Sequence, residues 1–160
     1  MIQLSFVKKR VRLPWFMRYL FDTDHLSVLQ KSTGQDYQNL SKRMERIPII
    51  DFAISIVTVH EQLLGSHTYI NRARDETQLL RGYEMMTRLV GNLKVIPTLG
   101  FDRRSLDIFK DLKSQQLKIG TMDLRIASIS ISHNLTLLTR NHKDFNQIPK
   151  LLIEDWTSIY

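Results

Sequence analysis

The 160-residue chain contains no cysteine. This absence excludes disulfide bonds and thiolate metal sites, so a metal ion would have to be held by oxygen or imidazole ligands. A chain without cysteine suits a reducing cytosol, and we expect a cytoplasmic location. Long apolar runs are also missing: no run of 18 or more uncharged apolar residues occurs, so we predict no membrane span.

The positive charge of the chain is unevenly placed. The net charge is +7, but Lys8, Lys9, Arg10 and Arg12 contribute +4 within residues 1–16, which contain no acid. Charge is therefore weak support for a nucleic-acid partner. The basic run interrupts the apolar stretch of this segment, which is not the pattern of a signal peptide. We expect residues 1–16 to be a poorly ordered extension and 17–160 to form one domain.

Short β-branched apolar runs alternate with longer amphipathic segments along the chain. Strands are predicted at 18–22, 52–57, 94–96, 136–139 and 151–153. Helices are predicted at 24–31, 37–46, from about 58, and at about 70–90, 102–116 and 122–133. This alternation predicts a three-layer α/β/α fold with a mostly parallel central sheet. An apolar stripe at Leu79, Tyr83, Met86 and Val90 is typical of core or of a subunit interface.

Four acids lie where a parallel sheet would bind a ligand, outside the carboxyl ends of its strands. Asp22 closes the first predicted strand, and Glu61 lies four residues beyond the second. Asp123 opens the last predicted helix, and Asp144 follows the fourth strand by five residues. Glu61 and Asp123 fall on apolar helix faces, where carboxylates need a hydrogen bond or a cation. A hard divalent ion is the natural partner of several converging acids.

Each acid also has a purely structural interpretation. Asp22 or Asp24 could cap the next helix, and Thr121 could cap the helix that carries Asp123. Glu61 could be an exposed helical residue if the helix begins one or two residues away from the predicted start. Asp144 could be a solvated loop residue. The four acids therefore carry the hypothesis only as a set.

Taken in order, four segments resemble the PIN-domain ribonucleases, specifically the VapC-like toxins of bacterial toxin–antitoxin pairs. These segments, with the chain's closing stretch, are 19–27 (YLFDTDHLS), 54–65 (ISIVTVHEQLLG), 119–127 (IGTMDLRIA), 137–145 (LLTRNHKDF) and 148–156 (IPKLLIEDW). The resemblance covers about residues 17–156. It implies a PIN-like fold and hydrolysis of RNA phosphodiester bonds with Mg²⁺ or Mn²⁺.

Residue by residue, the resemblance places the family's first acid on Asp22, its glutamate on Glu61 and its third acid on Asp123. The fourth position falls on either Asp144 or Asn141. Asp22 and Asp123 are expected as direct metal ligands, with Glu61 and Asp144 as further ligands or as groups that orient water. Asp24 stands where the family commonly has asparagine and adds an acid beside the site.

Other residues near the predicted site are expected to support it. Ser27 and Thr139 are candidates to hydrogen-bond the carboxylates or bound water. Arg140, His142 and Lys143 are candidates to contact RNA phosphates, although a solvated loop explains them equally well. None of the histidines is expected to bind metal. The resemblance further implies a cognate antitoxin and a homodimer.

Three alternatives stay open at this point. A receiver-like signalling domain would need an acceptor aspartate after the third strand and a lysine after the fifth, where this chain has Pro97-Thr98 and Glu154-Asp155. A catalytically inactive PIN-like module could bind RNA or a partner without cleaving it. DNA could replace RNA as the substrate. The intact set of acids favours the ribonuclease.

Overall fold

The computed structural model describes residues 17–159, and its centre is a fully parallel sheet. Among these residues five strands are present: β1 (Tyr19–Phe21), β2 (Phe52–Ser55), β3 (Thr98–Leu99), β4 (Thr136–Leu138) and β5 (Leu152–Glu154). They lie in the order β3-β2-β1-β4-β5, and every neighbouring pair is parallel. The predicted α/β fold with a parallel sheet is confirmed.

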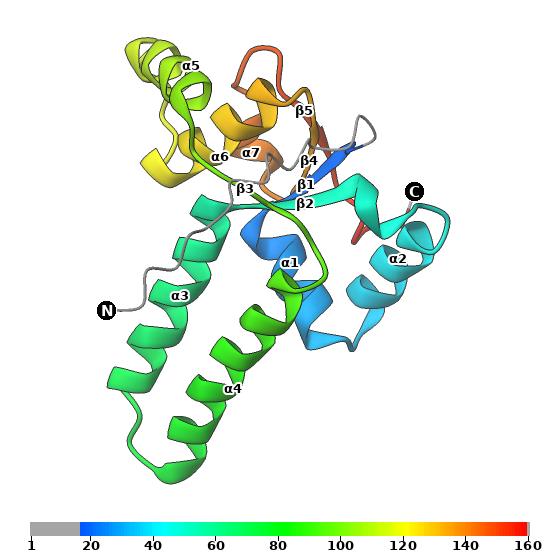
Figure 1. Cartoon of the computed structure of the whole chain (residues 1–160), viewed down its shortest axis with the longest axis vertical. Helices are drawn as coiled ribbons and strands as arrows, with labels where there is room; N and C mark the ends of the chain where they lie inside the picture. The colour runs from blue at the N-terminus through cyan, green and yellow to red at the C-terminus, as the bar shows by residue number, and fades with distance from the viewer. Residues whose placement is uncertain (1–16, 160) are drawn as a thin grey trace, which may run out of the picture.

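Helices lie on both faces of the sheet (Figure 1). The helical elements are α1 (Thr23–Lys31), α2 (Gln35–Met44), the short 3₁₀ turn η1 (Ile49–Asp51), α3 (Ile56–Asn71), α4 (Glu76–Leu93), α5 (Arg103–Ser114), α6 (Thr121–Ser132) and α7 (His142–Phe145). In Figure 1, α5, α6 and α7 lie above the sheet, and α1 and α2 lie below it. Helices α3 and α4 form a long hairpin that projects away from the sheet. Three layers result, as predicted.

Alternation along the strands divides the core between the two faces. Leu20 is paired with Ala53 and Leu137, and all three belong to the core beneath α5 and α6. The next residue, Phe21, is paired with Ile54 and Leu138 in the core on the α1 side. Because both faces are covered, nearly every central-strand residue is apolar, which explains why these segments read as continuous hydrophobic runs.

Two predictions about the middle of the chain were wrong. Residues 94–96 form no strand: Lys94 is the C-cap residue of α4, and the edge strand β3 follows at Thr98–Leu99. The helix predicted over 70–90 is divided, since α3 runs to Asn71 and Asp75 caps α4 by accepting from the Gln78 backbone N–H at 2.8 Å. The apolar content of residues 94–96 does not reveal that their backbone N–H groups bond to carbonyl groups in the last turn of α4.

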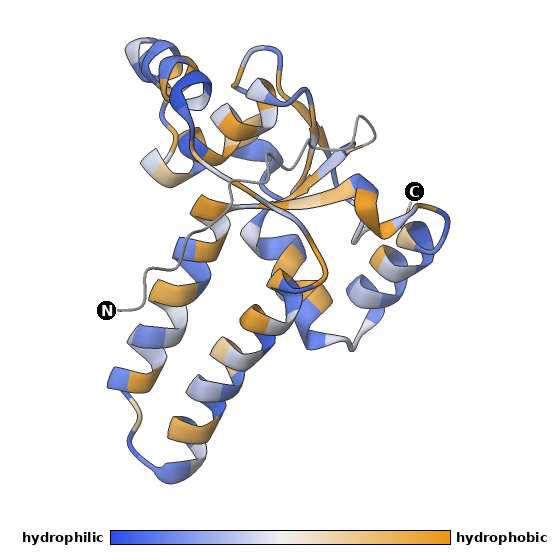
Figure 2. Ribbon diagram, viewed as in Figure 1, coloured by the Kyte–Doolittle hydropathy of each residue, from blue (hydrophilic) through white to orange (hydrophobic). Residues whose placement is uncertain are grey.

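The apolar stripe of α4 lies mostly at the surface. Leu79, Tyr83 and Val90 are exposed, and Met86 is partly buried. Figure 2 shows apolar segments along the α3–α4 hairpin, interspersed with polar ones. The stripe is therefore not core. Within residues 17–159, no helix has both the length and the apolar character needed to cross a membrane.

Candidate active site

The carboxyl ends of β1 and β4 are neighbours at the point where the strand order reverses. From β1 the chain adds β2 and β3 on one side of the sheet, whereas β4 and β5 lie on the other. Asp22 follows β1 and its backbone N–H donates to the Leu138 carbonyl at 3.0 Å, next to Thr139 at the end of β4. In open α/β sheets this reversal opens a crevice that binds ligands.

Asp22 is buried at this reversal, the predicted crevice of the acids, and both of its carboxylate oxygens accept hydrogen bonds. Oδ1 accepts from the Thr23 backbone N–H at 2.8 Å, which makes Asp22 the N-cap of α1, and Oδ2 accepts from the buried Thr139 hydroxyl at 2.8 Å. The capping interpretation is thus correct, and it coexists with a place in the site. Burial, followed by the charge of Asp24, raises the pKa of Asp22 to about 7.

Glu61 reaches the same crevice from α3. Ser55 caps this helix by accepting from the Thr58 backbone N–H at 2.8 Å, so the helix begins at Ile56, earlier than predicted. Glu61 therefore lies in the second turn, where it is partly buried and accepts a hydrogen bond from the Thr23 hydroxyl. The interpretation of Glu61 as a freely exposed residue is wrong.

Asp123 enters from the first turn of α6. Gly120, not Thr121, is the N-cap residue of this helix, and a Cβ at Gly120 would lie 3.3 Å from Asp123 Oδ2. The carboxylate of Asp123 has no hydrogen-bond or ion-pair partner among residues 17–159. Burial first, and then the charges of Glu61, Asp144 and Asp24, raise its pKa to about 6. Acids from four segments of the chain therefore act on one another here.

Asp144 and Asn141 contact each other at the start of α7. The Asn141 side-chain amide donates to Asp144 Oδ2 at 3.0 Å, and its oxygen accepts from the Asp144 backbone N–H at 3.4 Å. The backbone N–H of Asn141 donates to the Thr139 hydroxyl at 3.0 Å. Of the two candidates for the fourth position, Asp144 supplies the charge that acts on Asp123, while Asn141 positions Asp144.

Asp24 is held by His25, which the sequence interpretation did not single out, and by Arg140, which it proposed as an RNA contact. His25 is fully buried; its Nε2 accepts from the Trp156 backbone N–H at 3.0 Å, which leaves Nδ1 to donate to Asp24 Oδ1 at 2.8 Å. The Arg140 backbone N–H donates to Asp24 Oδ2 at 2.9 Å, and its side chain pairs with Asp36 at 3.1 Å. Both Asp24 oxygens thus accept a hydrogen bond from the protein, and the Asp24 charge contributes to the raised pKa values of Asp22 and Asp123.

Of the remaining predicted residues, some contact the carboxylates and others do not. Thr139 bonds Asp22 as expected, but Ser27 touches no carboxylate within the part of the chain described: its hydroxyl donates to the Thr23 carbonyl and accepts from Gln62. His142 is partly buried and Lys143 is exposed on α7, at the rim. Thr23 and His25 were missed, although both lie within three residues of Asp22 in the DTDH segment.

The site fits a hard divalent cation by its chemistry. The acids contribute carboxylate oxygens, which are the ligands that hard divalent cations prefer. The Asp123 carboxylate lacks a protein partner in the described chain, and burial together with neighbouring charges raises its pKa. Among residues 17–159, however, no three His, Cys, Asp or Glu side chains stand close enough to hold a metal ion as a group. Mutual repulsion favours such separation between carboxylates that share no cation.

Known proteins similar to this chain are ribonucleases. No protein-family model matches the chain. Ribonuclease VapC of Rickettsia bellii is 32% identical over 101 residues, which cover 61% of this chain and 71% of the relative. VapC1 of Haemophilus influenzae is 28% identical over 142 residues, or 88% of this chain and 99% of the relative. VapC2 of Rickettsia felis is 48% identical over 46 residues, a match that spans 34% of that relative.

A solved structure shares the fold. The complex titled VapBC2 from Rickettsia felis, bound to a DNA fragment from its promoter, contains a chain that matches with a TM-score of 0.69 and 24% identity. The match covers 88% of this chain and 99% of that one. The acids gather where the strand order reverses, and the sequence is similar to those of several VapC ribonucleases. The chain therefore belongs to the VapC family, the PIN-domain ribonuclease toxins of toxin–antitoxin pairs.

Proposed function

We propose that this chain is a Mg²⁺- or Mn²⁺-dependent endoribonuclease whose catalytic carboxylates are Asp22, Glu61, Asp123 and Asp144. One observation supports this most strongly: Asp123, without a protein partner in the described chain, feels the charges of Glu61, Asp144 and Asp24 from three other segments. A site that gathers acids in this way favours a divalent cation, which can bridge the carboxylates and a phosphate.

The residues divide the work of hydrolysis among themselves. Asp22 and Asp123 would hold the metal ion, which when bound would lower the pKa of a water molecule and polarise the phosphoryl oxygen. Glu61 orients the attacking water, and the Thr23 hydroxyl holds Glu61 in place. Asp144 completes the acidic set, and the hydrogen bond from the Asn141 amide holds it in place. Thr139 keeps Asp22 aimed into the crevice.

The rim residues position the RNA. Arg140, exposed beside Asp24, and Lys143 offer positive charge next to the acids, and His142 lies between them in sequence. Contacts of this kind hold the phosphate backbone without reading bases. We expect binding to weaken as salt rises, because the contacts are with phosphates.

The partners follow from the family. We propose that a cognate antitoxin binds this chain and controls it, because a solved relative from Klebsiella pneumoniae is a toxin–antitoxin complex. We also propose a homodimer, for which the exposed stripe of α4 is the candidate surface. With RNA as its substrate, the chain is expected to act in the cytoplasm.

The alternative is a PIN-like module that binds RNA or a partner but does not cleave. The complete acidic set weighs against it, because a module without catalysis has no need of carboxylates that raise one another's pKa. DNA as the substrate is a second alternative, since the carboxylates themselves do not discriminate the sugar.

The test is cleavage of RNA by the purified chain with Mg²⁺, Mn²⁺ or EDTA, and with single-stranded DNA in parallel. We expect metal-dependent cleavage of RNA only. Asp22→Asn and Asp123→Asn should each reduce the rate roughly 100-fold or more, because loss of even an outer partner of a metal ligand commonly costs 10- to 100-fold. Titration with Mn²⁺ by calorimetry should show the loss of binding independently of activity.

A matched control is Asp111→Asn, which removes an exposed acid of α5. Its rate and its Mn²⁺ affinity should equal those of the wild type. Cleavage that survives both active-site substitutions would contradict the assignment of the carboxylates. RNA binding without cleavage by the wild type would support the inactive module.

A further inference from the structure

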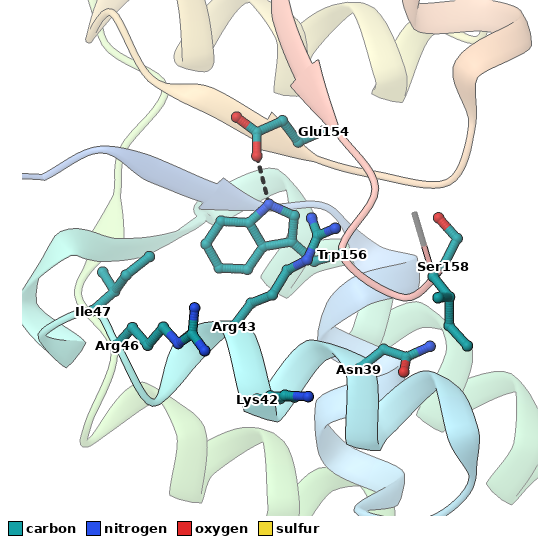
Figure 3. Close-up of a pocket in the computed structure, with 9 residues that line it drawn as sticks. Asn39, Lys42, Arg43, Arg46, Ile47, Glu154, Trp156 and Ser158 are labelled. Carbon is teal, nitrogen blue, oxygen red and sulfur yellow. Dashed lines mark hydrogen bonds between the residues drawn. The ribbon is translucent and has the colours of Figure 1, made fainter.

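A basic pocket lies outside the acidic crevice, between α2 and the segment that follows β5 (Figure 3). It has a volume of about 540 Å³. It is lined by Lys42 and Arg43 from α2, Arg46 from the turn after this helix, Glu154 at the end of β5, and Trp156 from the C-terminal segment that follows. We name this the α2 pocket. None of the four proposed catalytic carboxylates lines it.

The charges of the α2 pocket favour an anion. Glu154 is the acid among its lining residues, and its carboxylate accepts from the Trp156 indole N–H at 2.6 Å. Lys42 and Arg46 are exposed, and within residues 17–159 their side chains make no ion pair or hydrogen bond. Cations without a local counter-charge attract an anionic ligand over several ångströms.

Contacts between α2 and the C-terminal segment fix the walls of the pocket. Arg43 donates to the Asp155 carbonyl at 3.5 Å, and its guanidinium lies 5.9 Å from the centre of the Trp156 ring. Asn39 donates to the Thr157 carbonyl at 2.7 Å and so ties the C-terminal segment to α2 one turn earlier. These contacts hold α2 and the C-terminal segment together as the two sides of the pocket, as Figure 3 shows.

The α2 pocket is connected to the active site along one face of α2. Positions 36, 39 and 43 follow one another at helical spacing and therefore share a face of α2, and Arg46 lies two residues beyond the end of the helix. At the active-site end, Asp36 pairs with Arg140, whose backbone N–H bonds Asp24. From Asp36 to Arg43 the helix rises about 10 Å, at 1.5 Å per residue. A strand of several nucleotides bound at the carboxylates would span this distance.

We propose that the α2 pocket binds a backbone phosphate of the RNA strand that flanks the scissile bond, with Lys42 and Arg46 as the contacting residues. This inference rests on the proposed function, because it requires RNA at the acidic crevice. Trp156 is buried, with only 3% of its surface exposed, so no base can stack on its ring. The pocket therefore holds phosphate and contributes affinity without a preference for sequence.

The test measures binding separately from cleavage. The variant Lys42→Ala/Arg46→Ala is made in the Asp123→Asn background, and binding to fluorescent single-stranded RNAs of different length is followed by anisotropy at several salt concentrations. Each phosphate contact in single-stranded nucleic acid contributes a slope of about 0.7 to the fall of log affinity with log salt. We expect the slope to become shallower by about 0.7, the contribution of one phosphate, for a long RNA and to stay unchanged for a dinucleotide.

The matched control is Arg104→Ala/Lys110→Ala, which removes two positive charges from exposed positions of α5. This variant has the same net charge as the α2 variant, but its substitutions lie above the sheet, whereas α2 lies below it (Figure 1). It should retain the wild-type slope for every RNA. An equal loss of slope in both variants would overturn the proposal, because it would show an effect of overall charge alone.

Two further outcomes separate the possible explanations. If the chain cleaves RNA and the α2 variant binds long RNA as tightly as its parent, the pocket is not an RNA site, although the proposed function stands. If instead a poly-glutamate peptide binds the wild type and loses affinity only in the α2 variant, the pocket is a docking site for an acidic protein segment. Failure of the wild type to cleave any RNA contradicts the proposed function itself.

Discussion

Burial and neighbouring charge control the protonation of Asp22, the residue at the centre of the crevice. Its carboxylate is removed from water and lies near Asp24, and these two effects outweigh the hydrogen bonds from Thr139 and Thr23 that favour the ionised form. The pKa of about 7 is therefore the property of a site prepared for a positive charge. A bound cation would reverse the balance and keep Asp22 ionised.

A pH dependence of stability follows from this raised pKa in metal-free protein. The folded state favours protonated Asp22, so its contribution is fully present below the unfolded pKa near 3.8 and is lost as pH rises through the folded value near 7. The variant Asp22→Asn has no ionisable group at this position, so it does not lose this contribution to stability as pH rises. Relative to the wild type, we expect the variant's free energy of unfolding to rise between pH 4 and pH 8, by an amount on the order of 1–4 kcal/mol. Urea titrations with EDTA at several pH values measure it.

Asp102→Asn provides a control of opposite sign. Asp102 caps α5, and its pKa is lowered, chiefly by the hydrogen bonds from the Ser105 backbone and side chain. Its ionised form stabilises the fold above the unfolded pKa, so Asp102→Asn should cost stability at neutral pH and little at low pH. A difference between Asp22→Asn and wild type that does not vary with pH would rule out the proposed cause.

At the scale of secondary-structure elements, one residue determines how closely α3 and α4 approach. Gly82 is buried in α4, and a Cβ placed there would collide with Ile70 Cγ1 in α3 while lying 3.4 Å from the Ile70 Cα and backbone nitrogen. Ile70 is branched at its Cβ and cannot swing aside easily. The hairpin therefore depends on a missing side chain at position 82.

Gly82→Ala should destabilise the protein even though alanine favours helix. Overpacking costs about 1–3 kcal/mol, whereas the gain in helix propensity is about 1 kcal/mol. Gly91→Ala in the same helix is the control, because a Cβ at position 91 meets no atom within 4 Å; this variant should gain stability. Thermal unfolding followed by circular dichroism compares the two. Equal shifts of the melting temperature would mean that the helices do not pack closely at Gly82.

At the scale of the whole molecule, the α3–α4 hairpin presents apolar surface that the described chain leaves uncovered. Leu79, Tyr83 and Val90 lie along α4, with exposed fractions of 42%, 56% and 53%. Contiguous exposed apolar surface of this kind commonly marks an interface between proteins. It supports the proposed homodimer.

Light scattering coupled to size-exclusion chromatography tests the homodimer. We expect the wild type to elute as a dimer and Leu79→Glu/Tyr83→Glu as a folded monomer, because charges buried in an interface without partners disfavour association. Leu152→Glu, at a still more exposed apolar position of β5, should remain dimeric. If only Leu152→Glu dissociates the dimer, the interface lies at the edge of the sheet and not on the hairpin.

The site could be predicted from the sequence in part, and particular residues show why. Asp22 and Glu61 stood out because Asp22 closes an apolar predicted strand and Glu61 interrupts the apolar face of the helix that follows another. Thr23, in contrast, is an ordinary polar residue at a helix start, and its bond to Glu61 spans 38 positions. The same is true of His25, which reaches the backbone of Trp156, 131 positions away.

The amino-acid sequence by itself determined the parallel α/β class and the four acids, because strand alternation, helix periodicity and the family's short motifs are properties of neighbouring residues. Only the tertiary structure decided that Asp144 acts on Asp123 while Asn141 holds Asp144, that both Asp24 oxygens accept hydrogen bonds from the protein, and that α2 and the C-terminal segment form a basic pocket. These features depend on the order of the strands, which brings distant segments to one edge of the sheet.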